Sequence, residues 1–274
     1  MPELPEAENI GRALQRILPG RTITGVEIFS PAMRSSLEPL KTAGLEGRKF
    51  TGVRRRARYL IAGLDDGRGL LMHFGMSGVV RVEDADVPKR KHEHVFIHLD
   101  NKKIFRFECT RRFSLLEVHE LTAPGRMPET LRHLGPEPFS EELTADYMIS
   151  KAAGRNTCVK NFIMDNAVVT GIGNIYASES LFAARIHPAR PVKTLKETEW
   201  NLIITHVRSI LKRAISAGGS SISDFLNVDG SEGKFAQELK VYGLAGTPCP
   251  VCGTQLENVK LGGRSSCFCP KCQK

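Results

Sequence analysis

The apolar residues of the first twenty positions recur at helical spacing. Six of them share one face of a helix over residues 3–19: Leu4, Ala7, Ile10, Leu14, Ile17 and Leu18. Pro5 lies in the first turn, where a missing N–H breaks no helical bond, and Gly20 follows the last apolar position. This pattern predicts an amphipathic helix at the N-terminus.

The pattern changes after residue 22 to short apolar runs with the character of strands. Seven such runs follow one another up to about residue 118: "RTITGVEIF", "RYLIAGL", "GLLMHF", "GVVRVE", "HVFIHL", "KIFRFE" and "RFSLLEV". The segments "LDDGRG" and "LDNKK" between them are typical of tight turns. We therefore predict an antiparallel β-sandwich or barrel with the N-terminal helix packed on it.

The second half of the chain is predominantly helical. The segment "RHLGPEPFSEEL" (132–143) holds two prolines and a glycine and is predicted to link two domains. Helical periodicity then covers four stretches: 142–152, 160–165, 174–185 and 195–217. A segment rich in Ser, Gly and Asp follows over 218–234, and its length predicts either a functional or a mobile loop.

The cysteines gather at the C-terminal end, where five of the seven lie in the last 26 residues. An odd count without a secretion-signal pattern disfavours a disulfide framework. Two Cys-x-x-Cys pairs, "CPVC" and "CPKC", instead have the spacing of a closed tetrahedral zinc site. We predict one structural zinc ion per chain, bound by Cys249, Cys252, Cys269 and Cys272. Cys267 is left to packing or to a free thiol.

The charge of the chain favours a polyanionic partner. The formal net charge is +9 and the pI is about 9.3, and nucleic acid is the commonest partner of such chains. In "RRRAR" (54–58), strand alternation would place Arg54, Arg56 and Arg58 on one face and Arg55 on the other. That face is either a groove for phosphates or a solvated sheet surface. Arg264, in the predicted hairpin turn "GGRSS", has the same two interpretations.

Three short motifs close strands or open a helix. "HFGMSG" and "TRRFS" place Met76 and Phe113 beside polar residues, and the pattern alone favours core positions for both. The alternative is a pair of exposed wedges that enter a base stack together with Arg111. In "GIGNIY", Asn174 is predicted to cap a helix whose free amides could bind an anion. One Gly-x-Gly without a βαβ pattern around it does not support a dinucleotide fold.

Membrane and secretory classes are excluded by the same patterns. No apolar run reaches the roughly 18 residues that a membrane span needs. A basic segment followed by an apolar one is absent from the start of the sequence. We therefore expect a cytoplasmic protein.

The motifs taken together resemble those of the formamidopyrimidine-DNA glycosylase and endonuclease VIII family. The resemblance covers almost the whole chain, through "MPELPE", "HFGMSG", "KHEH", "RRF", "LGPEP", "MDNAVVTGIGNIYASESLF", "QELKVYG" and the tail "CPKCQK". "LGPEP", "GIGNIYASESLF" and the tail favour the formamidopyrimidine branch. The resemblance implies an α+β fold with an N-terminal antiparallel β-sandwich, a helix-two-turn-helix element and a four-cysteine zinc finger, with damaged double-stranded DNA bound between the domains.

This resemblance suggests domain boundaries and a catalytic set. The boundaries are a catalytic β-sandwich domain (1–131), a linker (132–143), a helix-two-turn-helix domain (144–239) and a zinc finger (240–274). Removal of Met1 would give Pro2 a secondary amine that attacks C1′ of deoxyribose, with Glu3 as general acid and base. The remaining implied catalytic residues are Glu6, Arg58 and Arg264.

The DNA-binding residues are carried over in the same way. The implied set is His73, Met76, His92, Arg111, Phe113, Arg155, Lys160 and Asn174. Met76, Arg111 and Phe113 match the three residues that fill the gap left by a flipped base. The segment 218–234 matches the one that covers the extruded base.

Two departures from the family pattern bear on activity. The family's "RRxKY" lysine is Arg58 here, and its "DPRRFG" reads "CTRRFS". The predicted function is a monomeric DNA glycosylase and AP lyase of base-excision repair. It would excise oxidised purines such as 8-oxoguanine and formamidopyrimidines, and then cut the strand by β,δ-elimination. The alternatives are an endonuclease VIII-like enzyme for oxidised pyrimidines and a lesion-binding or abasic-site-binding protein with weak lyase activity.

Overall fold

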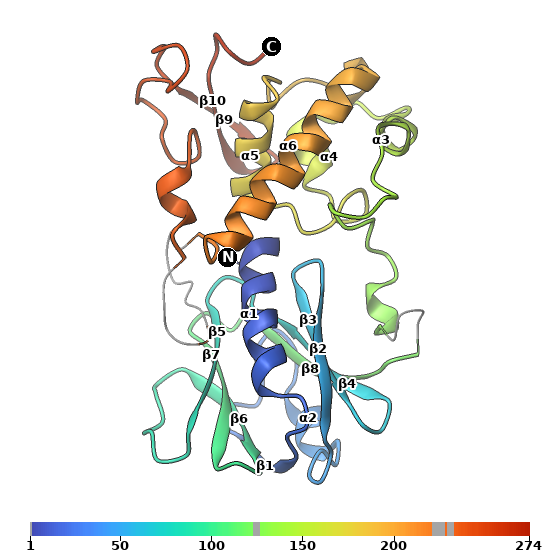
Figure 1. The fold of residues 1–274 in the computed structure, drawn as a ribbon, viewed down its shortest axis with the longest axis vertical. Helices are drawn as coiled ribbons and strands as arrows, with labels where there is room; N and C mark the ends of the chain where they lie inside the picture. Colours follow the sequence, from blue (N-terminus) through green and yellow to red (C-terminus); the bar gives the residue numbers. More distant parts are fainter. Residues whose placement is uncertain (1, 123–126, 221–227, 229–232) are drawn as a thin grey trace. The chain divides into compact units, whose positions relative to one another are not determined.

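The computed structural model describes residues 2–122, 127–220, 228 and 233–274 (Figure 1). The chain forms two compact units. One comprises Met1–Arg132 and Ala217–Ala236, and the other comprises His133–Ser216 and Gln237–Lys274. The described residues 217–220, 228 and 233–236 thus belong to the same unit as the N-terminal helix.

Helix α1 (Leu4–Ile17) begins after Glu3 and buries the apolar face predicted from the sequence. Leu4, Ile10 and Leu14 are among its fully buried residues. Gly11 allows close packing, because a Cβ atom there would lie 2.9 Å from the side chain of Leu60 on strand β3.

Two four-stranded antiparallel sheets follow α1 in the chain. One has the order β1-β6-β7-β5 and the other the order β2-β3-β4-β8. The strands are β1 (Ile23–Ile28), β2 (Phe50–Arg56), β3 (Tyr59–Leu64), β4 (Arg68–His73), β5 (Gly78–Asp84), β6 (Glu93–Leu99), β7 (Lys103–Cys109) and β8 (Leu115–Glu120). Short helices α2 (Glu38–Thr42) and η1 (Glu129–Leu131) complete this part.

The core of the N-terminal unit lies between the two sheets. One cluster of buried apolar residues combines Leu60 and Met72 from the β2-β3-β4-β8 sheet with Val95 and Phe107 from the other sheet. Phe74, just after β4, stacks on Phe107 with ring centroids 5.9 Å apart. The predicted antiparallel β-sandwich with a helix against it is confirmed.

The chain turns inside the arginine-rich segment 54–58, although strand alternation was expected over the whole segment. Strand β2 ends at Arg56, and Ala57 and Arg58 form a two-residue turn into β3. Ala57 has a φ of 56°, in the left-handed region that such hairpin turns require. Arg58 therefore lies at the tip of the β2–β3 hairpin, and the expectation that it shares a strand face with Arg54 and Arg56 was wrong.

The second unit is helical. It contains α3 (Ala145–Ala152), α4 (Val159–Ile163), α5 (Asn174–Ala183), η2 (Val192–Thr194) and α6 (Glu197–Ser216), and η3 (Phe235–Glu238) follows in the chain. Trp200 on α6 is fully buried and packs on Phe162 of α4, with ring centroids 5.7 Å apart. Within the described residues, no helix has both the length and the apolar character needed to cross a membrane.

A small hairpin near the C-terminus completes this unit. Strands β9 (Glu257–Leu261) and β10 (Arg264–Phe268) are antiparallel, and both residues of their turn, Gly262 and Gly263, have positive φ. Arg264 is therefore the first residue of β10, directly after the predicted turn.

Glu179 on α5 joins the segment before the hairpin to the helices. Its buried carboxylate accepts hydrogen bonds from the backbone N–H groups of Lys240, Val241 and Tyr242 at 2.8–3.0 Å. Each of these three donors would be costly to bury without a partner. The segment leading to the hairpin is thus tied to the core of the helical unit.

Candidate active site and nucleic-acid interface

The start of α1 brings together the three residues predicted to begin the chemistry. Pro2 is buried, and Glu3 and Glu6 are only 3% and 2% exposed. Glu3 is the N-cap of α1, and its backbone N–H donates to Glu6 Oε2 at 2.9 Å in a capping box. The helix N-terminus also favours negative charge, so it stabilises both carboxylates where they lie.

Glu6 is fixed from a second side by a distant part of the chain. Its Oε1 accepts hydrogen bonds from the backbone N–H of Ser220 at 2.8 Å and from the Ser220 hydroxyl at 3.1 Å. Gly219 permits this approach, because its φ is 86° and a Cβ atom there would lie 3.1 Å from Glu6. The Glu6 carboxylate thus connects the N-terminus, which is predicted to be catalytic, to the segment predicted to cover an extruded base.

Sequence reasoning missed Ser220. Its only signal was the "GGS" sequence after a long helix, since two glycines mark a backbone that can turn sharply. Most of the predicted covering loop, residues 221–227 and 229–232, lies outside the described residues.

His73, at the end of β4, is a neutral hydrogen-bonding group. Burial, reinforced by the charges of Arg58 and Arg34, lowers its pKa to about 4. Its Nδ1 accepts the Gly75 N–H at 3.1 Å, so the proton of the neutral ring is on Nε2. The ring can therefore donate to a phosphate oxygen without carrying a charge. Tyr59, the residue after Arg58, pairs with His73 across β3 and β4, so the β2–β3 turn is close to the end of β4.

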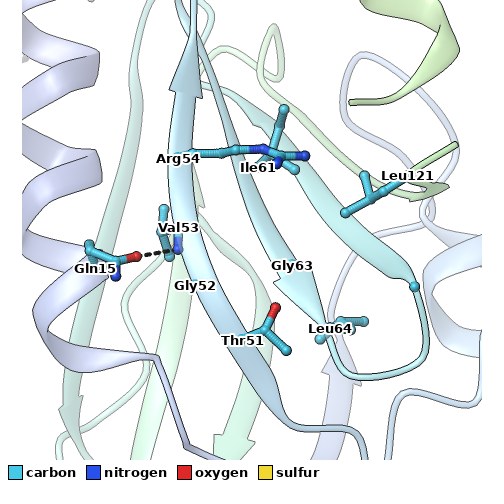
Figure 2. A pocket seen from close by; sticks show the side chains of 10 residues that line it. Gln15, Thr51, Gly52, Val53, Arg54, Ile61, Gly63, Leu64 and Leu121 are labelled. Carbon is cyan, nitrogen blue, oxygen red and sulfur yellow. Dashed lines mark hydrogen bonds between the residues drawn. The ribbon is translucent and has the colours of Figure 1, made fainter. Parts of the chain in front are cut away.

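A pocket of about 480 Å³ on the β2–β3–β4–β8 sheet does not contain this site (Figure 2). Gln15, Thr51, Arg54 and Leu121 are among its described lining residues, and none of these residues belongs to the predicted catalytic set. Figure 2 shows Arg54 extending across it toward Ile61.

Arg55 points to the other side of β2. Its Nε donates to Glu8 of α1 at 2.7 Å and its Nη1 to the Ala57 carbonyl at 3.0 Å. Burial opposes ionisation of Glu8, but hydrogen bonds from Arg55 and Arg12 hold the pKa of Glu8 below its ordinary value. Arg55 therefore joins α1 to the turn that carries Arg58, which fixes the turn relative to the helix.

Two neighbouring loops present apolar side chains to solvent. Met76 is 40% exposed and Phe113 is 51% exposed, and the guanidinium of Arg111 lies 5.4 Å from the centre of the Phe113 ring. The core positions favoured by the pattern were therefore wrong, and the geometry is that of the alternative, exposed wedges. His92 is half-buried beside them, and its carbonyl accepts the Cys109 N–H at 2.9 Å.

In the helical unit, two of the predicted DNA-binding residues lie around the turns between α4 and α5. Arg155 is exposed, forms an ion pair with Asp165 at 3.7 Å and lies over the ring of Phe162. The N-cap of α5 is Gly173 and not Asn174, so the capping prediction was wrong by one residue. Asn174 Oδ1 is buried without a hydrogen-bond partner in the described part of the chain.

Lys160 on α4 is almost fully buried, unlike the other predicted phosphate ligands. Its Nζ donates to the Ser265 carbonyl at 2.9 Å and to the Ser266 hydroxyl at 2.7 Å. Asn161 lies beside the hairpin turn, because a Cβ atom at Gly262 would be 2.8 Å from its amide nitrogen. Helix α4 therefore holds the hairpin that begins β10 with Arg264. A direct contact of Lys160 with DNA stays a prediction.

The four predicted zinc ligands converge at the end of this unit. Their sulfur atoms all lie within 4.8 Å of one another, with Cys249 to Cys272 at 4.0 Å and Cys252 to Cys269 at 3.5 Å. A tetrahedral ion with Zn–S bonds of about 2.3 Å places sulfur atoms about 3.8 Å apart, so the group fits zinc. Four thiolates leave no open position, so the ion is structural. Cys267 is outside this group and packs in the small apolar cluster of the finger.

Comparison with known proteins decides the family. Three family models match the chain: the formamidopyrimidine-DNA glycosylase N-terminal domain over residues 1–116, the formamidopyrimidine-DNA glycosylase H2TH domain over 134–226, and the zinc finger found in FPG and IleRS over 246–274. The chain belongs to the formamidopyrimidine-DNA glycosylase family. The resemblance described from the motifs is thereby confirmed, as are the zinc-finger fold of the tail and its single structural zinc.

Relatives of this family match over their whole length. The formamidopyrimidine-DNA glycosylase of Vibrio parahaemolyticus is 43% identical over 274 residues, with all of both chains covered. That of Aliivibrio fischeri is also 43% identical, with all of this chain and 98% of the relative covered.

Solved structures of the family share the fold. A Lactococcus lactis FPG variant in complex with Fapy-dG containing DNA has a TM-score of 0.89 and 31% identity, with both chains fully covered. A structure of MutM in complex with carbocyclic 8-oxo-G containing DNA has a TM-score of 0.88 and 32% identity, again over both full chains.

Proposed function

We propose that this chain is a DNA glycosylase and AP lyase of base-excision repair that excises oxidised purines from double-stranded DNA. The observation that carries the proposal is the start of α1, where Pro2 adjoins two buried, fixed carboxylates in a chain of this family. The basic net charge of +9 suits a DNA substrate. Its place of work is then the cytoplasm, where bacterial DNA lies, and one chain supplies every group the reaction needs.

The chemistry begins at Pro2 once Met1 has been removed. An α-amino group has a pKa of about 8, so a useful fraction is unprotonated near neutral pH. Its lone pair forms a bond to C1′ while the bond from C1′ to the base breaks, and the base leaves with a proton. Opening of the sugar ring gives an iminium ion, which stays cationic because the attacking nitrogen is a secondary amine. Glu3 is the group placed to exchange protons with the sugar.

Strand cleavage follows from the iminium ion. It withdraws electrons from the sugar, so loss of the C2′ proton breaks the C3′–O bond and loss of the C4′ proton then breaks the C5′–O bond, which releases the two flanking phosphates. Water finally hydrolyses the iminium ion and frees Pro2. Arg58 and Arg264 act in this scheme as fixed positive charges beside phosphates, because a guanidinium does not readily give up a proton. The zinc ion has no step of its own and orders the finger.

Borohydride trapping tests this function directly. The wild-type protein, whose intact mass should lack Met1, is expected to form a covalent adduct with abasic duplex DNA in the presence of borohydride. Pro2→Gly should lose most of this adduct, because glycine offers a primary amine on a less constrained backbone. A Pro2→Gly variant that traps and cuts as well as wild type would refute the assignment.

A lesion panel separates the remaining candidates. Duplexes with 8-oxoguanine and with thymine glycol distinguish an enzyme for oxidised purines from one for oxidised pyrimidines. Good binding to abasic DNA without any adduct would indicate a binding protein, and Arg58 in place of the family's lysine is the feature that makes this outcome worth testing. An Arg58→Lys variant run alongside shows whether the arginine limits elimination.

A further inference from the structure

The loops that present Met76 and Phe113 are interlocked through their backbones. Gly75 has a φ of 56°, and a Cβ atom there would lie 2.4 Å from the carbonyl oxygen of Phe113. The backbone N–H of Arg111 donates to the Ser77 hydroxyl at 3.1 Å. The distance between the Met76 and Phe113 side chains therefore depends on the buried residues that pack under these two loops.

A buried hydroxyl and a buried thiol lie there. Ser114 and Cys109 are both 0% exposed, and Ser114 Oγ is 2.8 Å from the Phe74 carbonyl oxygen and 2.9 Å from Cys109 Sγ. The hydroxyl has one proton and a carbonyl can only accept, so the Ser114 O–H donates to Phe74 and the Cys109 S–H donates to Ser114 Oγ. This chain of two hydrogen bonds joins the ends of β4 and β7 to the start of β8.

The surroundings leave this pair no room to move. A Cβ atom at Gly78 would lie 2.4 Å from Ser114 Oγ and 2.5 Å from the Phe74 carbonyl oxygen, so the hydroxyl occupies the space that a side chain would take. Gly78 also pairs with Cys109 across β5 and β7, and its N–H donates to the same Phe74 carbonyl at 2.7 Å. Loss of either hydrogen bond should therefore loosen the loops above this pair.

Cys109 and Ser114 are the first and last residues of the segment 109–114, in which this chain departs from the family pattern. "CTRRFS" replaces "DPRRFG", so an acid becomes Cys109 and a glycine becomes Ser114. In the structure the side chains of Cys109 and Ser114 form a hydrogen bond with each other. The two side chains therefore act together through one buried hydrogen bond.

We propose that Ser114 and Cys109 are positioning residues for base extrusion. They set the spacing and rigidity of the wedge formed by Met76, Arg111 and Phe113, and through it the ease with which the protein opens a damaged base pair. This inference rests on the proposed function. It predicts an effect on duplex substrates only, because a single strand has no partner base to separate and no gap to fill.

The test compares duplex and single-stranded DNA. Ser114→Ala should lower single-turnover excision from a lesion duplex about tenfold, as expected for the loss of two buried hydrogen bonds. It should also reduce the fluorescence rise of a 2-aminopurine placed beside the lesion, which reports opening of the stack. Borohydride trapping on a single-stranded abasic oligonucleotide should stay within about twofold of wild type.

Matched variants isolate the hydrogen bonds. Cys109→Ser keeps a proton donor and should retain duplex activity, whereas Cys109→Ala should behave like Ser114→Ala. Ser30→Ala removes another buried hydroxyl of the same unit, one that donates to the nearby Ala32 carbonyl, and should leave both activities unchanged. The Cys109 pair also provides the test if Ser114→Ala does not fold.

Two results would overturn the inference. One is a folded Ser114→Ala variant with wild-type duplex excision and 2-aminopurine signal. The other is an equal loss on duplex and single-stranded DNA, which would indicate general support of the fold. Failure of the proposed function looks different, because the wild-type protein itself would then form no adduct with either DNA.

Discussion

The start of α1 and the β9–β10 hairpin carry two parts of the proposed chemistry, and they are held in place by different means. Helix α1 has 14 residues, packs its apolar face into the sandwich core, and has its first turn fixed by the Glu6 carboxylate. The hairpin has strands of only five residues each. Its position is held by the four thiolates of the predicted zinc site and by the buried ammonium group of Lys160, which donates to the Ser265 carbonyl.

This difference predicts two kinds of failure. Substitutions at the start of α1 should change the chemistry while the sandwich stays folded, because many apolar contacts hold the helix. The finger has too small a core to fold without its metal, so loss of zinc should remove the function of Arg264 in one step.

Loss of zinc should have the largest effect. Cys269→Ser, or chelation of the metal, should abolish incision of abasic duplex DNA, because the hairpin that carries Arg264 loses its support. Trp200, the single tryptophan, is buried among the helices, so its fluorescence should stay close to that of the intact protein. Metal analysis of active wild-type protein that returns well under one zinc per chain would contradict this prediction.

Acid should weaken the sandwich through His73. Its folded pKa of about 4 is below the ordinary 6.5, so between these values the unfolded chain binds a proton that the folded one does not. The stabilisation is complete above pH 6.5 and is lost as the pH falls toward 4, by up to about 3 kcal/mol. His73→Gln should therefore flatten the pH dependence of unfolding measured by circular dichroism.

The tryptophan supplies the control for that experiment. Trp200 belongs to the helical unit and His73 to the other unit, so the fluorescence transition should have the same pH dependence in both proteins. Zinc release at low pH affects both proteins equally. Identical circular-dichroism curves for wild type and His73→Gln between about pH 4.5 and 7 would refute the role of His73.

Lys160 should act through Arg264. Lys160→Met leaves the Ser265 carbonyl and the Ser266 hydroxyl without the ammonium group, and should lower incision about tenfold, since such bonds contribute about 1–3 kcal/mol. In an Arg264→Ala background the same change should have little further effect, because both residues then serve one function. Lys193→Met, at an exposed lysine of the same unit, is the control.

Independent, multiplying effects of Lys160→Met and Arg264→Ala would contradict this coupling. That result would instead support a direct contact of Lys160 with a DNA phosphate, as the family resemblance implies.

Elements with a strong local signal could be predicted from the sequence. The apolar spacing of α1, the alternating runs of the sandwich and the two Cys-x-x-Cys pairs each contain the information for their own structure. Helix ends were less accurate, as at α5, where Gly173 takes the capping role expected of Asn174. A two-residue turn at Ala57 and Arg58 was hidden inside a run of arginines, because a non-glycine residue with positive φ leaves little trace in sequence.

Long-range polar contacts could not be predicted. Ser220 meets Glu6 across 214 positions, and Lys160 meets Ser266 across 106. Composition and periodicity describe neighbours along the chain, so they contain no information on such pairs. The pattern alone favoured core positions for Met76 and Phe113 for a related reason, since an apolar residue after a strand is usually core. The open alternative and the family resemblance pointed to the exposed positions that the interlocked loops hold.

The smallest effect is expected where one bond of several is removed. Ser220→Ala deletes the hydroxyl that donates to Glu6 Oε1, but the Ser220 backbone N–H still donates to the same oxygen at 2.8 Å. A loss of about 1 kcal/mol, or about fivefold in the single-turnover rate of adduct formation, is therefore expected. Ser220→Thr keeps the hydroxyl and should restore the rate. Equal rates for the Ala and Thr variants would mean that the backbone N–H groups of Glu3 and Ser220 are enough to fix Glu6. The start of α1 would then be held without the Ser220 side chain, whereas the finger needs its four thiolates.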